Sequence, residues 1–436
     1  MKVVLVLLIA LILSLNILIW NEFIVYSSFI AVLLIILFKD FLYEKIINAS
    51  LLLNPYYFFT IFFILYFSVG CVNLSTYRGV MNAGTVLSII MAYIAFIGGA
   101  KLGSWIKVKR NPVHLDRKRL KTGTIFLLLC SMAAAAYVTL KYGVIILHPS
   151  ERFYVPTTLI YFVLLAIIPP LVYFTYAQFN EIKITRMAAL SYMALPFCII
   201  ATSGYRGHLM IMLLTVGIVA YLLSRGPGRV KMFVYLIVAL LILSAGFYIR
   251  RDISTRLMQT EDLFARYDFN KKYLAVGSLH FASRETIGLY QKIVEIVPSK
   301  IDYGQGKLFF SDFMTILPGK QMSGGVLIYQ ITTGQDESAF GLTPSALGGL
   351  YFDFGYMGIF IGFGVMGILA SYFYKKYQVN QDVPSIANLS FVYVILMHYI
   401  HRGILAPYYL FLFVIMNILL FFSRSREEIR ETKVIT

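Results

Sequence analysis

The sequence predicts an all-α protein that crosses a membrane about twelve times. Three observations support this fold class. The 436 residues are 59% hydrophobic and only 14% charged, which is too apolar for a soluble protein of this length. The apolar residues form segments of about 20 residues, the length at which a helix crosses a bilayer. Lysine and arginine are concentrated in alternate connections, which is typical of membrane proteins with a fixed orientation.

Twelve segments are predicted to span the membrane. They are residues 2–20, 24–38, 56–73, 84–104, 122–140, 156–177, 187–202, 206–224, 232–249, 345–374, 386–402 and 404–422. The first follows Lys2, as the apolar part of a signal peptide would, but Trp20-Asn21-Glu22 comes after it in place of small residues. We therefore expect this segment to be a retained helix.

The basic residues predict the orientation. With a cytoplasmic N-terminus, 22 of the 38 lysines and arginines fall on the cytoplasmic side and five in the short outer connections. The other 11 lie in residues 250–344, together with 10 acidic residues. Most of the net charge of +17 is therefore an orientation signal, and nucleic-acid binding is not expected. The C-terminus is predicted to be cytoplasmic as well.

This topology divides the chain into four parts. Residues 1–249 carry the first nine spans, 250–344 form an outer loop, 345–422 carry the last three spans, and 423–436 form a cytoplasmic tail. The outer loop is too long for an ordinary connection, which favours a functional loop.

Within the loop, apolar residues recur at helical spacing in ETIGLYQKIVEIV, namely Ile287, Tyr290, Ile293, Val294 and Val297. We expect two to four short amphipathic helices in the loop. They would either lie on the outer membrane surface or pack on the spans as a small cap.

The start of the tenth span carries a candidate anion site. Thr343 and Pro344 are predicted to be its N-cap and first helical residue, and Ser345 follows. The positive end of this helix dipole would point outward and favour an anion, so Thr343 and Ser345 are candidate phosphate ligands. Further along, Gly358 and Gly362 predict close helix packing.

Five of the arginines on the predicted outer side, where lysine and arginine are disfavoured, are candidates for one shared role. Arg206, Arg250, Arg251 and Arg402 are flush with helix ends, and Arg284 lies in the loop. Anchoring to lipid headgroups would explain one such residue. Because guanidinium groups bind phosphate bidentately, the set instead predicts a shared phosphate or pyrophosphate ligand.

Candidate bases lie close to these arginines in the sequence. His398, His401 and Arg402 are spaced to share one helix face, and a histidine can take a proton from a hydroxyl. Ordinary bundle or interfacial roles fit both histidines equally well. Glu285, beside Arg284, is another candidate, and four further carboxylates are Asp312, Asp336, Glu337 and Asp353. Asp353 fits a local hydrogen-bonding role equally well.

No Walker loop, HExxH motif or Cys/His cluster is present in the sequence, so neither a metal nor a cofactor is expected. The three cysteines lie in or beside apolar segments without paired spacing, and they indicate no redox compartment.

Several motifs carry a family resemblance when they are taken in order. They are SGYRGHLM between two spans, SRET and LPGK in the loop, and SAFGLTPSALGGLYFDFGYMGI after it. This set, within about residues 200–405, is similar to the Wzy-type oligosaccharide repeat-unit polymerases of O-antigens and capsules. Arg206 and Arg284 match arginines of that family and Arg402 a late basic position, whereas no residue matches a catalytic base.

The resemblance implies a multi-pass glycosyltransferase of the bacterial cytoplasmic membrane. Such enzymes join repeat units carried on undecaprenyl pyrophosphate at the outer face, and release undecaprenyl pyrophosphate. The partners implied are this lipid-linked oligosaccharide, membrane lipid, a chain-length regulator and a flippase.

Three other functions are the alternatives. An O-antigen ligase-like transferase would share the arginines and pass the glycan to a different acceptor. A lipid-linked oligosaccharide flippase would place charges near the midplane and show two related halves, whereas here the arginines lie on one face. A membrane receptor has no sequence feature in its favour.

Overall fold

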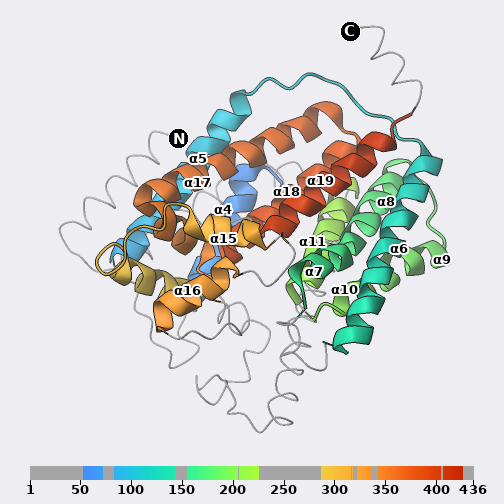
Figure 1. Ribbon diagram of the computed structural model, residues 1–436. Coiled ribbons are helices and arrows are strands. Elements are labelled where there is room, and N and C mark those ends of the chain that lie inside the picture. Colours follow the sequence, from blue (N-terminus) through green and yellow to red (C-terminus); the bar gives the residue numbers. More distant parts are fainter. Residues whose placement is uncertain are drawn as a thin grey trace.

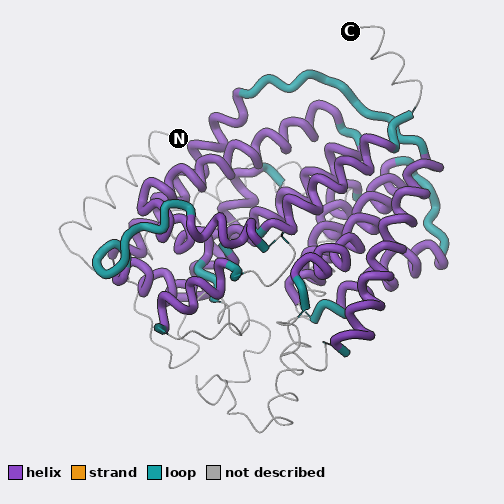
Figure 2. Tube along the Cα trace, in the orientation of Figure 1, coloured by secondary structure: helices purple, strands orange, loops and turns teal. Residues whose placement is uncertain are grey.

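The computed structural model describes residues 53–71, 83–143, 145, 155–204, 206–224, 286–315, 317, 322–334, 342–403 and 406–425. This part of the chain is helical and contains no β-sheet (Figures 1 and 2). One isolated bridge between Leu115 and Arg424 is the exception. The all-α fold class is therefore confirmed for the described residues.

Nine of the predicted spans fall wholly or mostly within these residues, and their described parts are helical. They correspond to α4 (Pro55–Cys71), α5 (Ala83–Trp105), α6 (Arg117–Tyr142), α7 (Thr157–Leu164) with η2 (Leu165–Ile167) and α8 (Ile168–Phe179), α9 (Arg186–Ala189) with η3 (Leu190–Ala194) and α10 (Leu195–Ala201), α11 (Arg206–Leu223), α17 (Ser345–Asn380), α18 (Val383–Arg402) and α19 (Pro407–Phe422). The predicted spans 2–20, 24–38 and 232–249 lie outside the described residues. The total of twelve stays a prediction.

Five of the described helices are long and apolar enough to cross a membrane. They are Gly84–Trp105, Arg117–Tyr142, Thr157–Phe179, Ser345–Asn380 and Val383–Arg402, and three shorter apolar helices accompany them. A soluble fold does not need this many long apolar helices, so the chain is an integral membrane protein.

Helix α18 is the centre of the bundle. It packs against α4, α8, α11, α17 and α19. Of its most apolar stretch, 89% is buried inside the protein, compared with 39% for α6. A helix that is buried on all sides is surrounded by protein, whereas α6 leaves most of its apolar surface for lipid.

Two spans change their helical pitch where prolines remove amide donors. In a regular helix, amides at positions 169 and 170 would donate to the carbonyls of Leu165 and Ala166, but Pro169 and Pro170 have no amide hydrogen. The 3-10 turn η2 lies at those carbonyls. Pro196 follows the π-helical turn η3 in the same way. The helix direction is kept in both places, so the predicted spans 156–177 and 187–202 hold.

The predicted tenth span, 345–374, is wrong as a continuous helix. Gly355 has φ 65° and ψ −152°, which breaks α17. As a result Leu350 lies against Gly358 and Gly362, residues that a straight helix would place roughly 12 and 18 Å away. Residues 345–354 therefore fold back on the long piece that follows. Gly358 faces this folded-back part of its own helix, whereas Gly362 faces both Leu350 and Tyr399 of the neighbouring helix α18.

The loop contributes three helices within the described residues: residues 286–296, α15 (Lys307–Met314) and α16 (Gly324–Thr333). In the first, Ile287, Tyr290, Ile293 and Val297 are buried, as their spacing predicts. The Tyr290 hydroxyl lies 2.5 Å from Ser88 Oγ on α5. The first helix thus packs on α5, while α15 packs on α17 and α16 packs on α15. Whether the loop also lies on the membrane surface stays a prediction.

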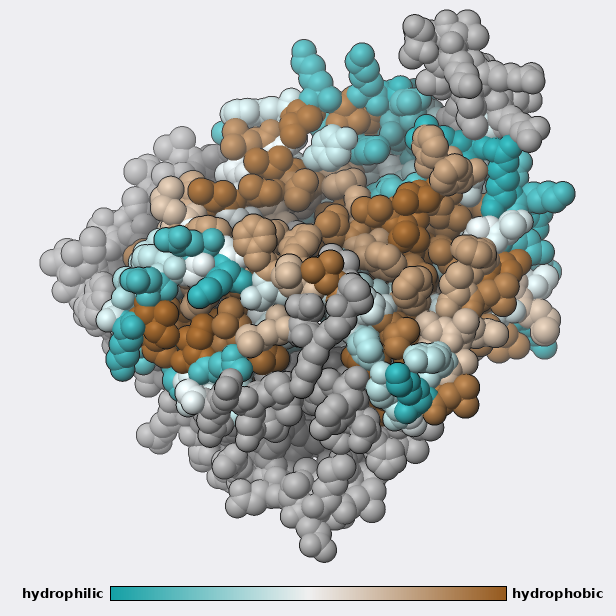
Figure 3. All heavy atoms as spheres, in the orientation of Figure 1, coloured by the Kyte–Doolittle hydropathy of each residue, from teal (hydrophilic) through white to brown (hydrophobic). Residues whose placement is uncertain are grey.

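Helix ends that were assigned to the cytoplasmic side meet at one end of the bundle. Val113 donates its amide to Asp382 Oδ2 at the start of α18 (2.8 Å). Lys375 Nζ near the end of α17 donates to the Ser104 carbonyl (2.8 Å). The connection 106–116 runs along this end (Figure 2), where hydrophilic residues border the apolar belt of the visible face (Figure 3). The predicted orientation requires these helix ends to lie at the same end of the bundle, as they do. Which end faces the cytoplasm stays a prediction.

Glycines let α5 and α17 approach each other more closely than any other helices described. A Cβ atom on Gly99 would lie 1.9 Å from the Gly364 carbonyl oxygen, and one on Gly103 would lie 2.5 Å from that of Ile368. On the opposite helix, a Cβ on Gly367 would lie 2.2 Å from the Phe96 carbonyl oxygen. Such contacts bring backbones together where lipid provides no hydrophobic drive for association.

We expect Gly99→Ala to destabilise the protein by about 1–3 kcal/mol, the typical cost of overpacking, because the rigid backbone of α17 cannot move aside. Thermal unfolding in mild detergent measures this. Gly98→Ala is the matched control, since no atom lies within 4 Å of its added Cβ. It should be neutral or stabilising by up to about 1 kcal/mol. Equal losses from the two variants would contradict the packing argument.

Candidate functional site

Four segments far apart in the sequence meet at the predicted outer end of the bundle. They are the start of α11, the end of α18, the start of α17 and the start of the loop helix at 286–296. Each contributes one of the motifs that the sequence analysis singled out. The arrangement is described below from each segment in turn.

The start of α11 is set by a glycine turn. Gly204 has φ 70°, a conformation that side chains other than glycine rarely adopt. The helix then begins at Arg206. Inside the turn, Ser203 Oγ lies 3.1 Å from His208 Nδ1, and both residues are buried. This turn fixes the backbone of Arg206 at the mouth of the bundle.

Arg402, at the end of α18, packs directly on the start of α11. A Cβ on Gly207 would lie only 3.2 Å from Arg402 Nη2 and 3.4 Å from its Cζ. The Arg402 charge also acts on His208, His398 and Tyr408. Two of the predicted phosphate ligands, Arg206 and Arg402, are thus in neighbouring positions despite lying almost 200 residues apart in the sequence.

The prediction that His398, His401 and Arg402 share one helix face is wrong for His401. His398 and Arg402 lie together, and His398 Nδ1 is 3.3 Å from the Val394 carbonyl. His401 instead faces α4, with its Nδ1 3.1 Å from the Tyr66 hydroxyl. One residue of separation rotates a side chain by about 100° around the helix, which is enough to place the two on different neighbours.

Tyr66 links the loop to the end of α18. Its hydroxyl lies 2.7 Å from Thr286 Oγ1 as well as 3.1 Å from His401 Nδ1. Its ring meets the imidazole edge to face, with centroids 5.7 Å apart. Thr286 is the last residue of the SRET motif, so Tyr66 brings this motif to His401. The candidates Arg284 and Glu285, which precede Thr286, lie outside the described residues, as do Arg250 and Arg251.

The start of α17 differs from its prediction. Thr343 is not the N-cap and Pro344 is not helical: Pro344 occupies the cap position without a side-chain hydrogen bond, and the helix begins at Ser345 with φ 62°. Ser345 Oγ is buried and donates to the Ile400 carbonyl (2.6 Å). The hydroxyl proton is therefore engaged by protein. Its contact holds the start of α17 against the end of α18.

Gly403 completes this junction between α17 and α18. It has φ 112°, and a Cβ there would lie 3.1 Å from the Ser345 carbonyl oxygen. Glycine is required both for the backbone angle and for the close approach. The motif HRG thus combines a histidine, an arginine and a glycine against which the start of α17 packs.

Asp353 has a structural role in this fold. Its carboxylate accepts the amides of Leu308 (3.0 Å) and Phe309 (3.1 Å) at the start of α15. A carboxylate at a helix N-terminus satisfies amides that have no partner within the helix. Of the two roles considered for Asp353, the structure shows the local hydrogen-bonding one. Tyr303, in turn, packs on Gly355 at the break.

The sequence analysis did not select Tyr66, Thr286 or Tyr408 as site residues. Tyr408 lies beside His208, with ring centroids 5.5 Å apart. Tyr66 lies inside the apolar run of α4, where a tyrosine carries no distinguishing signal. Thr286 was quoted only as part of SRET, and no spacing rule indicated that its hydroxyl has a distant partner.

Within the described residues, no group of three or more histidine, cysteine, aspartate or glutamate side chains could hold a metal ion. The side chains that the described residues bring together at this end carry guanidinium, imidazole and hydroxyl groups. Such a set can bind an anion and move a proton.

A comparison of the sequence with protein-family models identifies the family. The model of the O-antigen polymerase family matches residues 51–413, which is most of the chain. The chain belongs to the O-antigen polymerase family. No curated protein and no solved structure matches it significantly. The resemblance to the Wzy-type polymerases is confirmed, and this family member is a polysaccharide polymerase built from membrane helices.

One loop carboxyl of this polymerase gives a pH prediction. Burial, with a smaller contribution from the Asp353 charge, raises the pKa of Asp312 to about 6, although the Gly324 amide donates to its Oδ1 (2.7 Å). The folded state thus binds the proton more tightly than the unfolded state does. The free energy of unfolding should therefore fall by up to about 3 kcal/mol as the pH rises from about 4 to about 6, and it should stay at this lower value at higher pH.

We expect Asp312→Asn to remove this loss, since the amide oxygen can still accept from Gly324 while carrying no charge. The variant should unfold at a higher temperature than the parent at pH 8 and at a similar temperature at pH 4. Thermal unfolding at both pH values measures this. A difference of the same size at both would mean that charge is not the cause.

Proposed function

We propose that this polymerase extends a glycan carried on undecaprenyl pyrophosphate at the outer face of the bacterial cytoplasmic membrane. The bond between the anomeric carbon of the growing glycan and the pyrophosphate oxygen breaks. A bond forms from that carbon to a hydroxyl at the non-reducing end of the next lipid-linked repeat unit. The hydroxyl proton passes to a base, and undecaprenyl pyrophosphate leaves.

The observation that carries the proposal is the packing of Arg402 on Gly207, next to Arg206. The proposal assigns the guanidinium groups of both residues to one ligand, since two such groups suit a ligand that bears two phosphates. Their task in the reaction is to stabilise the negative charge that grows on the departing pyrophosphate. Fixed donors achieve this without reorganisation, and both arginines are attached to helix ends that glycine turns hold in place.

The start of α17 adds to this positive environment. Ser345 and Gly403 hold it against the end of α18, beside Arg402. In the proposal, the phosphate contacts of Thr343 and Ser345 come from the backbone at this helix start, because the Ser345 hydroxyl is bonded to Ile400. The loop arginine Arg284, two residues before Thr286, completes the set, and Arg250 and Arg251 are its outer members.

The base in this proposal is His401, with Glu285 as the alternative. His401 is half-buried and held by Tyr66, which also holds Thr286, the neighbour of Glu285. His398 is more deeply buried, with 8% of its surface exposed, and bonds its own helix. Among the three predicted candidates for the base, His398 is therefore the weakest.

The experiment that tests the proposal is incubation of purified protein with a synthetic lipid-linked repeat unit. A ladder of glycans that differ by one repeat supports polymerisation. Transfer of single units to another acceptor, with no ladder, would instead indicate a ligase-like transferase, and release of unreacted substrate across a bilayer would indicate a flippase.

We expect Arg402→Ala to lower the rate of chain extension by about 100-fold or more, the typical effect of removing one transition-state donor. Arg402→Lys should lose at least about tenfold, because an ammonium cannot bind phosphate through two parallel hydrogen bonds. Arg206→Ala should behave like Arg402→Ala. The rate of ladder formation measures each effect.

The matched control is Arg186→Ala, which removes an exposed arginine at the start of α9. Its rate should equal that of the parent. Because Arg402 also packs on Gly207, folded protein is quantified for each variant by thermal unfolding. Normal extension by folded Arg402→Ala would end the proposed phosphate role.

We also expect Tyr66→Phe to lower the turnover rate about tenfold with little change in KM, because His401 and Thr286 lose the hydroxyl that positions them. Tyr93→Phe is the control: its hydroxyl bonds Thr60 at 3.0 Å within the same bundle. Tyr66→Phe removes the contacts to Thr286 and His401 and should lose about 2 kcal/mol of stability, whereas Tyr93→Phe removes the bond to Thr60 and should lose about 1 kcal/mol. Equal turnover in the two variants would show that Tyr66 only stabilises the fold.

A further inference from the structure

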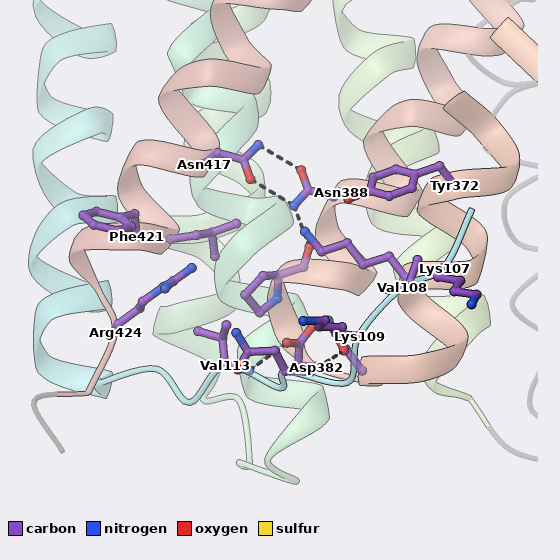
Figure 4. Close-up of a pocket in the computed structure, with 15 residues that line it drawn as sticks. Lys107, Val108, Lys109, Val113, Tyr372, Asp382, Asn388, Asn417, Phe421 and Arg424 are labelled. Atoms are coloured by element: carbon purple, nitrogen blue, oxygen red, sulfur yellow. Dashed lines mark hydrogen bonds between the residues drawn. The ribbon is translucent and has the colours of Figure 1, made fainter. Parts of the chain in front are cut away.

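A second polar site lies at the opposite end of the bundle from the meeting point of the start of α11 and the end of α18, the arginine junction of Arg206 and Arg402. It is a pocket of about 420 Å³ between the 106–116 connection, the end of α17, the start of α18 and the end of α19 (Figure 4). Four of its lining residues are basic: Lys107, Lys109, Lys376 and Arg424. The sequence analysis treated these residues only as orientation signals. Their convergence on one cavity is a separate feature of the fold.

The pocket carries an excess of positive charge. Among the lining residues, all of which the structure describes, Asp382 is the one carboxylate. Its two oxygens accept the amides of Val113 (2.8 Å) and Ser385 (2.9 Å). The carboxylate is thus committed to closing the start of α18. Four cations and one anion leave a net charge of about +3, which favours a ligand with phosphate oxygens.

The inner end of the pocket is polar although it lies between apolar helices. Asn388 Nδ2 donates to Asn417 Oδ1 (3.0 Å), and Asn417 Nδ2 donates to Asn388 Oδ1 (2.9 Å), as the dashed lines in Figure 4 show. The remaining amide hydrogens donate to the Pro384 and Phe413 carbonyls. This satisfied pair sets the depth to which a polar group can enter.

One wall of the pocket is apolar and exposed. Phe421 lines it with 58% of its surface exposed, and the Arg424 guanidinium lies 5.1 Å from the centre of its ring. Beyond it on α19, Phe422 is 70% exposed and Ile418 is 45% exposed. The charged pocket therefore opens beside apolar helix surface of the kind that faces lipid. A ligand with a phosphate and acyl chains fits both surfaces at once.

We infer that this pocket binds the headgroup of an anionic phospholipid from the leaflet on that side of the membrane. The phosphate lies among Lys107, Lys109, Lys376 and Arg424, and the acyl chains follow the exposed side chains of α19. Basic pockets between membrane helices are suited to such headgroups. A soluble phosphate compound would use the same cations but not the apolar wall. The inference is independent of the polymerase reaction proposed at the other end.

The test uses full-length protein purified in an uncharged detergent and stripped of lipid. Phosphatidylglycerol, phosphatidylcholine or inorganic phosphate is titrated in separate arms, and the unfolding temperature is recorded. A ligand that binds only the folded state raises this temperature in a saturable manner. We expect saturable stabilisation by phosphatidylglycerol, with little effect of phosphatidylcholine or of inorganic phosphate at the same concentration.

The test variant is Lys109→Gln combined with Lys376→Gln, which removes two of the four charges. We expect it to raise the apparent Kd for phosphatidylglycerol roughly tenfold or more. The control is Lys118→Gln combined with Lys183→Gln, which removes two exposed lysines outside the pocket and should keep the parent Kd. The unfolding temperature without lipid shows whether each variant is folded.

Three outcomes would overturn the inference. The first is an equal Kd in the test and control variants, which would indicate attraction to charge anywhere on the surface. The second is stabilisation by inorganic phosphate as strong as that by phosphatidylglycerol, which would show a soluble ligand. The third is equal stabilisation by phosphatidylcholine, which would show a site for lipid tails alone. Should the test variant fail to fold, Lys107→Gln with Lys109→Gln, both on the connection, takes its place.

Discussion

Close approach at glycine is the constraint on which the rest of this structure depends. Lipid is as apolar as a leucine surface, so helices in a membrane gain little from burying apolar side chains against each other. They associate where small residues allow backbone contact, as at Gly99 and Gly367 between α5 and α17. The same device builds the arginine junction. Gly207 leaves room for the guanidinium of Arg402, and Gly403 lets α18 end against Ser345.

Hydrogen bonds between distant segments then fix what the glycines bring close. Asp353, within α17, holds the start of α15, and Tyr66, within α4, holds Thr286 and His401. Polar groups in an apolar surrounding are costly unless they are bonded, so each contact strongly favours one arrangement. Both contacts attach the loop to the bundle, as does the Tyr290–Ser88 hydrogen bond, and the contact at Tyr66 lies in the candidate site. At the other end, the Asn388–Asn417 pair gives the basic pocket its polar inner end.

Much of the helical framework could be predicted because it depends on local properties. Span length and hydropathy identified each helix from α4 to α11 and from α17 to α19, and the spacing of Ile287, Tyr290 and Ile293 identified the loop helix. The errors have local explanations too. At the break, Tyr303 packs against Gly355, and a single glycine in a glycine-rich helix gives no sign of such a contact. Thr343 has the side chain of an N-cap, but Ser345 takes a positive φ to bond Ile400, and the helix starts later.

The sequence by itself determined that this chain is a helical membrane protein, that it resembles polysaccharide polymerases, and that Arg206 and Arg402 belong to one face. These properties follow from composition, charge bias and motif order, which are local or additive along the chain. Only the tertiary structure decided which side chains meet: Arg402 on Gly207, His401 on Tyr66, and four basic residues around one pocket. Helix rotation and crossing decide such contacts, and both depend on packing between segments hundreds of residues apart, which periodicity does not encode.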